Sequence, residues 1–263
     1  MATGESVGMS ESTPRTDPRD YHPPPSALTG RVILVTGASG GLGGALARGC
    51  ARLGARVILS GRNLKRLETV YDAIAADSSA LPFIAPLDLE RADSSAYAEL
   101  AAAVRREFGR LDGLAHVAAL LGERSPIEHY DVLSWVRVMH VNVNATFILT
   151  QTLLPLLRES QDGSVVFTTS SVSNRGRAYW GAYAVSKFAV EGLMQVLADE
   201  TDTTTAVRVN SVNPGRMRTA MRATAYPGED PSTVPAPEAA LAVYSYLLGP
   251  ESRGITGQRF DAQ

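Results

Sequence analysis

Tyr183 and Lys187 are two side chains capable of acid–base chemistry, and they stand one helical turn apart. A phenol ordinarily keeps its proton at neutral pH because its pKa is about 10. An ammonium group on the same helix face favours the phenolate, which would bring this pKa towards the range useful for proton transfer to a carbonyl oxygen. Only two of the 25 basic residues are lysines, Lys65 and Lys187, so Lys187 suggests a need for a compact ammonium. Taken alone, the pair also fits an ordinary exposed helix face.

A glycine-rich segment lies far upstream of this pair. Residues 36–43 read Thr-Gly-Ala-Ser-Gly-Gly-Leu-Gly and follow the apolar run 32–35. Apolar residues then recur at helical spacing, and Gly54 stands where the helix would end. Glycines let a backbone turn sharply and let a pyrophosphate approach the amides at a helix N-terminus. The segment therefore predicts a nucleotide-binding turn between a buried strand and a helix, with a flexible turn as the alternative.

Composition limits the classes of protein to which the chain can belong. Its 263 residues, 44% hydrophobic and 20% charged, are enough for one core. A net charge of -2 without a basic tract gives no footprint for nucleic acid or an anionic membrane. No apolar run approaches the roughly 20 residues that a bilayer requires, and Cys50 is the only cysteine. We expect a cytoplasmic protein with no intrachain disulfide and no metal site.

The composition changes near residue 28. Residues 1–27 are rich in Ser, Thr, Pro and charge and have no periodicity, which predicts a disordered tail. Tyr21–Pro25 forms either a stiff strap against the domain or an unattached polyproline-like segment. Residues 28–263 are expected to form a single domain that contains both the nucleotide-binding and the catalytic residues.

The rest of the chain alternates apolar strand candidates with helical stretches. The strand candidates are Val32–Val35, Val57–Leu59, Phe83–Leu87, Leu114–Val117, Val165–Thr168, Val207–Val212 and Arg259–Phe260. Continuous apolar strands alternating with helices predict an α/β fold with a parallel sheet covered on both faces. Ligands of such sheets bind beyond the carboxyl ends of the strands. The segments expected to converge there are Gly37–Gly43, Asp88, Ala118, Ser170 and Pro214–Gly215.

With these motifs assembled, residues 29–262 resemble the compact branch of the short-chain dehydrogenase/reductase family. The resemblance is carried by the glycine segment, the Tyr183/Lys187 pair, and the segments 142–147 and 213–219. Segments 141–147, 180–183 and 194–200 are similar to the YciK-like bacterial subgroup. The resemblance implies a single-domain doubly wound Rossmann fold with a mainly parallel seven-stranded sheet. It also implies a homodimer or homotetramer packed through helices near residues 132–158 and 180–200.

The family resemblance implies a catalytic tetrad. Tyr183 would be the acid/base, and Lys187 would also hydrogen-bond the nicotinamide ribose. Ser170 ends a strand candidate thirteen residues before Tyr183 and would hold the substrate oxygen, with Ser171 as its competitor. Asn142 would fix a helix kink and a water that relays protons to Lys187, since an asparagine is otherwise unfavourable within a helix.

Cofactor choice depends on the end of the second strand candidate. NAD-binding folds usually place a carboxylate there, but this chain has Gly61 followed by Arg62. A guanidinium would attract a 2'-phosphate, so we expect NADP(H) to be preferred over NAD(H); a solvated Arg62 is the alternative. The cofactor-binding residues implied by the resemblance are Gly37, Ser39, Gly41, Leu42, Gly43, Arg62, Asp88, Leu89, Ala118, Tyr183, Lys187, Pro214, Gly215 and Thr219.

One segment departs from the family pattern. The usual Asn-Asn-Ala-Gly after the fourth strand is here His116-Val-Ala-Ala119. Val117 lacks the side-chain hydrogen bonds with which an asparagine braces the sheet, and Ala119 adds a methyl where backbone passes close to the cofactor. His116 is expected to be a structural group and not a base.

The most concrete function that the residues and the resemblance support is transfer of a hydride between a nicotinamide and a carbonyl or alcohol substrate. The alternatives are a catalytically quiet NADP(H)-binding redox sensor, or a nicotinamide-dependent isomerase or dehydratase. Substrate contacts are expected from residues 120–125, 174–180 and 216–231. In the last segment, Arg218 and Arg222 are either basic groups of a lid that face an acidic substrate or, more simply, solvated charges.

Overall fold

The computed structural model describes residues 17–78 and 80–263. They form one seven-stranded sheet in the order β3-β2-β1-β4-β5-β6-β7, and all neighbouring strands are parallel. The strands are β1 (Val32–Thr36), β2 (Arg56–Gly61), β3 (Phe83–Pro86), β4 (Gly113–His116), β5 (Ser164–Thr168), β6 (Arg208–Asn213) and β7 (Arg259–Asp261). The order reverses between β1 and β4, so the expected doubly wound Rossmann fold is confirmed.

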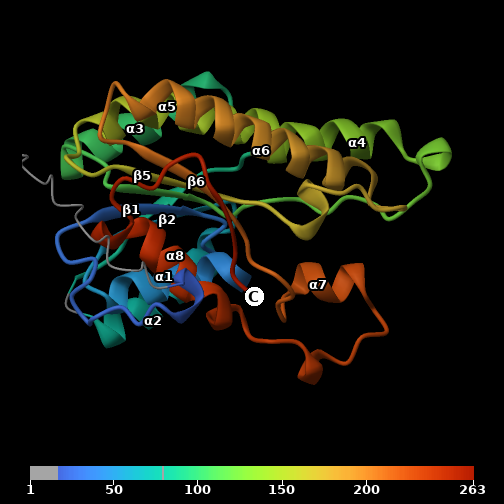
Figure 1. The fold of residues 1–263 in the computed structure, drawn as a ribbon, viewed down its shortest axis with the longest axis horizontal. Coiled ribbons are helices and arrows are strands. Elements are labelled where there is room, and N and C mark those ends of the chain that lie inside the picture. The colour runs from blue at the N-terminus through green and yellow to red at the C-terminus, as the bar shows by residue number, and fades with distance from the viewer. Residues whose placement is uncertain (1–16, 79) are drawn as a thin grey trace, which may run out of the picture.

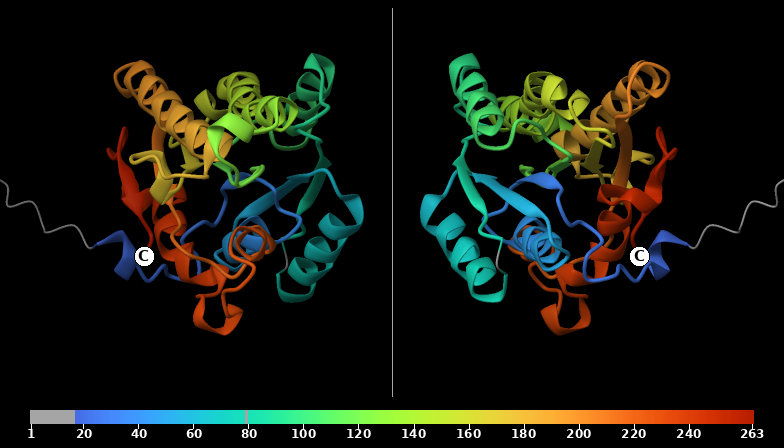
Figure 2. Two further views of the ribbon diagram at one scale, coloured as in Figure 1. Left: turned by 90° about the vertical axis from the view of Figure 1, so that its right-hand side faces the viewer. Right: turned by 90° about the vertical axis from the view of Figure 1, so that its left-hand side faces the viewer.

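Helices cover both faces of the sheet, as the two end views show (Figure 2). One face carries α1 (Gly41–Arg52), α2 (Leu64–Asp77) and α8 (Leu241–Leu248). The other carries α3 (Ser94–Phe108), α5 (Ala145–Arg158) and α6 (Gly181–Asp202). The continuous apolar strands are therefore buried from both sides, and β1 and β5 are buried at every residue.

The short helix α7 (Ala220–Ala225) is carried by a loop beyond the sheet, at the lower right of Figure 1. It follows β6 and precedes the segment that leads back to α8. Its residue Ala225 is buried in a small apolar cluster with Val172, Trp180, Tyr183 and Ala184. This cluster is separate from the two large cores under the helices, so α7 packs onto the carboxyl side of the sheet and not onto either face.

The longest apolar stretch is the helical run Val132–Arg158, in which α4 (Val132–Met139) and α5 are joined by a π-helical segment (His140–Asn144). By length and mean hydropathy, 1.2, this run meets the requirements for crossing a membrane, so the expectation that no apolar run approaches that length was wrong. The buried residues of α5 pack into the core under the sheet instead, and they include Leu149, Leu153 and Leu157. One side of the run therefore belongs to the core, while Val132, Leu133, Val136 and Phe147 are exposed.

The described chain begins with residues that rest on the domain. Asp17 caps a single turn of 3-10 helix at Pro18–Asp20. The ring of Tyr21 packs edge to face on Tyr246 of α8, with ring centroids 5.4 Å apart. The expected tail falls largely on residues 1–16, which lie outside the described residues.

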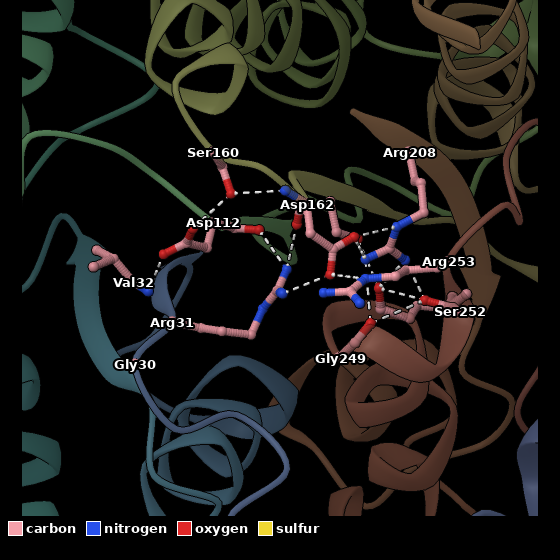
Figure 3. Close-up of polar contacts among 12 residues, drawn as sticks. Gly30, Arg31, Val32, Asp112, Ser160, Asp162, Arg208, Gly249, Ser252 and Arg253 are labelled. Carbon is pink, nitrogen blue, oxygen red and sulfur yellow. Dashed lines mark hydrogen bonds and ion pairs between the residues drawn. The ribbon is translucent and has the colours of Figure 1, made fainter. Parts of the chain in front are cut away.

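The amino ends of the central strands are joined by an ion-pair network centred on Asp162, which immediately precedes β5 (Figure 3). Its carboxylate pairs with Arg31 at 2.8 Å, with Arg208 at 2.9 Å and with Arg253 at 3.3 Å. Arg208 also donates to the carbonyl oxygens of Leu247 and Gly249. A single buried carboxylate thus links β1, β5, β6 and the end of α8.

Candidate active site

The glycine segment forms a tight turn from β1 into α1. Gly37 and Gly41 have φ values of 67° and 53°, in the left-handed region that favours glycine. A Cβ on Gly43 would lie 2.3 Å from the carbonyl oxygen of Gly37, and one on Gly37 would lie 3.0 Å from Cα of Ala118. These contacts show that the turn closes on itself and on the end of β4, so glycine is required at Gly43 by space and at Gly37 by space and backbone angle.

The first turn of α1 has no side-chain cap. Gly40 occupies the N-cap position, where α2, α3 and α4 have Asn63, Asp93 and Asp131 accepting a backbone N–H. The first amides of α1 are therefore left for an acceptor from outside the helix, and the helix dipole favours a negative one. An uncapped helix start beside a glycine turn fits the pyrophosphate of a dinucleotide.

A groove runs from this turn along the carboxyl ends of β1, β2, β3 and β4. Its lining residues are Thr36, Gly37, Ser39, Ser60, Gly61, Arg62, Leu87, Asp88, Leu89, Glu90, Ala118, Ala119, Leu120 and Val141. The predicted residues Gly37, Ser39, Arg62, Asp88, Leu89 and Ala118 are thus brought together. Asp88 also accepts a hydrogen bond from the backbone of Glu90 at 3.1 Å, so it closes a turn in addition to lining the groove.

Arg62 lies at the rim of this groove with its side chain 57% exposed. Its Nη1 is 3.4 Å from Glu90 Oε2, a long contact, while Arg137 of α4 binds the same carboxylate at 2.7 Å. The Arg137 hydrogen bond, more than Arg62, lowers the pKa of Glu90. Because Arg137 holds the Glu90 carboxylate closely, Arg62 is only weakly paired at this rim.

The predicted residues after β6 lie across the glycine turn. Thr219 caps α7 by accepting from Arg222 N at 3.2 Å, and its Cγ2 is 3.5 Å from the position a Cβ would occupy on Gly41. The turn at Pro214 and Gly215 is held by the side chain of Gln263, which donates to the carbonyl oxygen of Pro214 at 2.9 Å. The carboxyl ends of β1 and β6 therefore approach each other at the start of α1.

The proposed proton-transfer groups meet where β5 ends and α6 begins. Tyr183 and Lys187 lie on one face of α6, and both are buried. The hydroxyl of Ser170 lies close enough to the Tyr183 phenol to lower its pKa, whereas Ser171 is exposed. Lys187 Nζ donates to the carbonyl oxygen of Thr168 at 2.7 Å and lies 5.7 Å from the centre of the Tyr183 ring. Of the two serines left open by the sequence, Ser170 is the one close to the phenol.

The pKa of Tyr183 departs from its ordinary value in the direction opposite to the expected one. Burial raises it to about 12, and the Ser170 hydroxyl only partly opposes this. Lys187, whose Nζ donates to the Thr168 carbonyl, does not contribute the expected lowering. Burial also lowers the pKa of Lys187 to about 8, partly opposed by the carboxylate of Glu191. At neutral pH the pair is thus a protonated phenol beside an ammonium.

Asn142 lies in the π-helical segment, where the i to i+5 hydrogen-bond pattern interrupts the long helix. Its side-chain oxygen accepts from Leu120 N at 2.7 Å, and its Nδ2 donates to Leu120 O at 2.9 Å and Ser186 Oγ at 3.0 Å. Asn142 therefore links the loop after β4 to Ser186 of α6, the residue before Lys187. Asn144 is exposed and takes no part in these contacts.

His116 is fully enclosed at the end of β4. Its ring stacks on Phe167 at 4.9 Å, and its Nε2 is 2.9 Å from Thr150 Oγ1. Thr150 donates its own proton to Thr146 O, so the imidazole Nε2 is the donor in that contact. Burial, and then Lys187, lowers the pKa of His116 to about 3. A neutral, stacked imidazole is a structural group, as expected from the sequence.

A sequence profile of the short chain dehydrogenase family matches residues 31–230. The chain belongs to this family. The oxidoreductase YciK of Escherichia coli K12 is 50% identical over 243 residues, which is 92% of this chain and 96% of the relative. Gluconate 5-dehydrogenase of Gluconobacter oxydans is 32% identical over 200 residues, 76% of each chain. The resemblance seen in the sequence is therefore confirmed, and this short chain dehydrogenase is an oxidoreductase.

Solved structures of other short chain dehydrogenases superpose over almost the whole domain. One from Pseudomonas syringae has a TM-score of 0.92 and 56% identity, covering 93% of this chain and 99% of the other. One from Escherichia coli CFT073, complexed with NADPH, has a TM-score of 0.89 and 50% identity, covering 92% and 100%. One from Shigella flexneri 2a, complexed with NADP, has a TM-score of 0.89 and 49% identity, covering 91% and 100%.

Two contacts in this short chain dehydrogenase were not foreseen from the sequence. The hydroxyl of Thr36 accepts from Val117 N at 2.9 Å and Ala118 N at 3.1 Å, which braces β1 against the end of β4 where the family motif has an asparagine. Ser186 connects Asn142 to α6. The Thr36 contact could have been suspected, because a threonine ends a buried strand there. The contact between Asn142 and Ser186 could not, because it depends on the π-helical geometry.

Arg222 and Arg218, in the segment after β6, differ in whether they are paired. Arg222 forms a bidentate pair with Glu229, with both N to O distances 2.6 Å, and stacks over Tyr226 at 3.8 Å. Arg218 is exposed. Arg222 is therefore neutralised within its own segment, and neither arginine stands against Tyr183 as a free basic group of a lid.

Proposed function

We propose that this short chain dehydrogenase is an NADP-dependent oxidoreductase that moves a hydride between a nicotinamide and a carbonyl or alcohol carbon. The observation that carries the proposal is the meeting of a serine hydroxyl, a phenol and an ammonium, Ser170, Tyr183 and Lys187, at the strand ends that also form the glycine turn. Bound nicotinamide would supply the hydride, and the chain would supply the proton and the orientation.

In the reducing direction, the Ser170 hydroxyl holds the substrate oxygen beside the phenol. Tyr183 donates the proton to that oxygen, and its raised pKa of about 12 keeps it protonated until the transfer. Lys187 stabilises the phenolate that forms and binds the ribose hydroxyls. Asn142 positions α6 through Ser186. In the oxidising direction Tyr183 would have to be a phenolate, which accepts the proton of the substrate hydroxyl and becomes the phenol again.

The nucleotide is held by the residues that line the groove and by those that face the glycine turn. Gly37, Ser39, Gly41, Leu42 and Gly43 would surround the pyrophosphate, and Asp88, Leu89 and Ala118 the adenosine. Pro214, Gly215 and Thr219 would border the nicotinamide. The close approach of Thr219 to Gly41 supports this assignment.

A preference for NADP(H) over NAD(H) is supported by the rim charges. Gly61 offers no carboxylate to a ribose 2'-hydroxyl, and Arg62 is held only at 3.4 Å by Glu90, so its guanidinium remains free to turn towards a phosphate. Two similar short chain dehydrogenases were solved with NADP and NADPH.

Further proposals concern assembly and setting. We propose that exposed apolar side chains on α4, α5 and α6 pair copies of the chain into a homodimer or homotetramer. These side chains are Val132, Leu133, Val136, Phe147, Val185, Phe188 and Val196.

We propose residues 28–263 as a single functional domain and the cytoplasm as its setting. Burial raises the pKa of the lone thiol, Cys50, to about 12, which leaves it inert.

The test of the proposed function is NADPH consumption with a panel of ketones, aldehydes and quinones, both uncharged and carrying a carboxylate. Tyr183→Phe should lower kcat by about a hundredfold or more while leaving NADPH binding intact. Tyr71→Phe, on α2, is the matched control and should change neither. Tight NADPH binding without turnover of any substrate would contradict the proposal and favour a redox sensor.

A further inference from the structure

A cluster of aromatic rings and guanidinium groups lies beside the phenol of Tyr183. Trp180 directly precedes α6, and its ring centroid is 5.8 Å from that of Tyr183. Tyr226 directly follows α7, and its ring centroid is 6.0 Å from that of Trp180. The two rings therefore form a wall that continues from the proposed acid/base towards α7.

Two arginines from different loops converge on this wall. The guanidinium of Arg124 lies over both rings, 5.0 Å from the centroid of Trp180 and 5.1 Å from that of Tyr226, and donates to the carbonyl oxygen of Ala225. Arg177 donates to the Tyr226 hydroxyl at 3.0 Å and lies 6.0 Å from the Trp180 centroid. Cation–π contacts of this kind stabilise a guanidinium but leave its charge uncompensated.

These two charges have no acidic partner in the part of the chain that the structure describes. Neither Arg124 nor Arg177 forms an ion pair there, although Arg222 of the adjoining helix is fully paired with Glu229. The indole Nε1 of Trp180 is also enclosed without a hydrogen-bond partner. Arg124 and Arg177 are exposed residues, and the acceptors they have, the Ala225 carbonyl and the Tyr226 hydroxyl, are neutral. A guanidinium forms its strongest hydrogen bonds with an anionic acceptor, so both groups remain available to one.

The same place is where a substrate has to enter. Tyr183 is only 9% exposed and shares an apolar cluster with Ala225, against which Met221 and Tyr226 pack. The nucleotide groove ends at Ala118–Leu120 and Val141 without reaching the phenol. A substrate that contacts Tyr183 must therefore displace the end of α7, and in doing so it takes from Arg124 both the Ala225 carbonyl and the Tyr226 ring. A negatively charged group is the replacement that suits a guanidinium best.

We propose that Arg124 and Arg177 bind a carboxylate of the substrate, so that this enzyme acts on carbonyl or hydroxyl compounds that carry an acid group. The proposal rests on the proposed function, because it places the carboxylate within reach of the same phenol. The aromatic wall of Trp180 and Tyr226 would hold a planar or apolar body between the acid group and the reacting carbon. These two arginines then set substrate specificity and take no part in proton transfer.

The test uses the full chain saturated with NADP and two probes of equal shape, benzoate and benzamide. Binding is followed by the fluorescence of Trp180, with Trp135→Phe as the background so that only one indole reports. Benzoate should bind at least about tenfold more tightly than benzamide, the effect of one charge-assisted hydrogen bond. Arg124→Gln and Arg177→Gln should each weaken benzoate about tenfold and leave benzamide unchanged. Arg175→Gln, on the same exposed loop as Arg177, is the control and should change neither.

Equal affinity for the two probes, no saturable response to benzoate, or an unchanged ratio in both variants would overturn the proposal. A role for Arg124 confined to holding α7 closed would change benzoate and benzamide by the same factor, which also contradicts it. Turnover of uncharged ketones by the wild-type enzyme, and its loss in Tyr183→Phe, is measured separately. Failure of the acid-group proposal is thereby distinguished from failure of the proposed function.

Discussion

At the amino ends of the strands, the arginines are paired with carboxylates, whereas at the carboxyl ends several donors have no strong acceptor. Asp162 receives Arg31, Arg208 and Arg253, and its side chain is 9% exposed. At the opposite edge, the first turn of α1 has no side-chain cap, and Trp180 Nε1 has no partner among the described residues. Within the described chain, the amino edge thus pairs its buried charges, with Arg31 Nε left over, whereas the carboxyl edge leaves a helix start and an indole without an acceptor.

The difference separates the residues that stabilise the fold from those that are available to ligands. Taking a carboxylate and guanidinium groups out of water costs several kcal/mol, and only close pairing and extra hydrogen bonds offset that cost. The amino edge has both. At the carboxyl edge the unpaired groups gain their partners when a nucleotide or substrate binds. Stability and affinity are therefore expected to respond to mutations at opposite ends of the strands.

The largest effect is expected at the amino edge. Asp162→Asn leaves Arg31 and Arg208 buried without their carboxylate, so the free energy of unfolding should fall by about 3–5 kcal/mol. Urea denaturation followed by circular dichroism measures this change. The protein that remains folded should keep its affinity for NADPH.

Glu107→Gln is the matched control, because its ion pair with Arg56 is exposed on both sides, 47% and 50%, and such pairs contribute little. Equal destabilisation by the two substitutions, or a loss of NADPH affinity in folded Asp162→Asn, would break the comparison between the two edges.

At the carboxyl edge the expected effect is on affinity. Arg62→Ala should weaken NADPH about ten- to a hundredfold, because a charge-assisted contact with the 2'-phosphate is lost, and should leave NADH unchanged. Isothermal titration calorimetry with both nucleotides gives the ratio. The free energy of unfolding of Arg62→Ala should equal that of the wild type, since the Arg62 side chain is 57% exposed.

Arg52→Ala, at the far end of α1, serves as the control for a change in net charge. A wild-type enzyme that binds NADH and NADPH equally, or an Arg62→Ala variant that loses both alike, would show that Arg62 is a solvated surface charge.

The comparison of the two edges also shows which features of the fold could be predicted from the sequence. The strands were recognised because continuous apolar runs between helices indicate a buried parallel sheet, and all seven predictions overlap a strand of the structure. Their ends shifted by one or two residues, as at β6, which runs over Arg208–Asn213 and not over Val207–Val212. The positions of the glycine turn, Asp88 and Ala118 along one groove followed from topology, because parallel strands end at one edge.

The contacts that could not be predicted join residues far apart in the chain. Arg124 and Trp180 are in different loops, and nothing in either segment indicates that a guanidinium lies over an indole. The pairing of Arg62 with Glu90, and of Glu90 with Arg137, likewise depends on tertiary packing. The direction of the Tyr183 pKa was predicted wrongly because spacing along a helix reveals the neighbouring ammonium but not the burial that outweighs it. Roles of individual site residues remain proposals.

The pH dependence of activity should reveal Lys187 at the carboxyl edge. With a pKa of about 8, its ammonium is lost above that pH, so kcat/KM for carbonyl reduction should fall on the alkaline side. Glu191 raises this pKa, so Glu191→Gln should move the decline to lower pH. His116, with a pKa of about 3, should contribute no change near neutrality.

Stability should change in the opposite sense over the same range. The folded-state pKa of Lys187 lies below the ordinary value of 10.5, so the unfolded chain binds more protons between about pH 8 and 10.5, and the free energy of unfolding should rise there. Lys187→Met should abolish this rise. If kcat/KM declines at the same alkaline pH in Glu191→Gln as in the wild type, a group other than Lys187 causes that decline.

The smallest effect concerns backbone strain beside the proposed substrate wall. Tyr179 is the one non-glycine residue of the described chain with a positive φ, 70°, and its side chain is exposed. That conformation costs about 1–2 kcal/mol, part of which glycine would return as unfolded-chain entropy. Tyr179→Gly should therefore raise stability by at most about 1 kcal/mol, measured by thermal denaturation. If kcat/KM falls while stability rises, the backbone strain at Tyr179 serves to hold Trp180 against Tyr183. If both stay unchanged, the strain has no function, and only the unpaired polar groups distinguish the carboxyl edge.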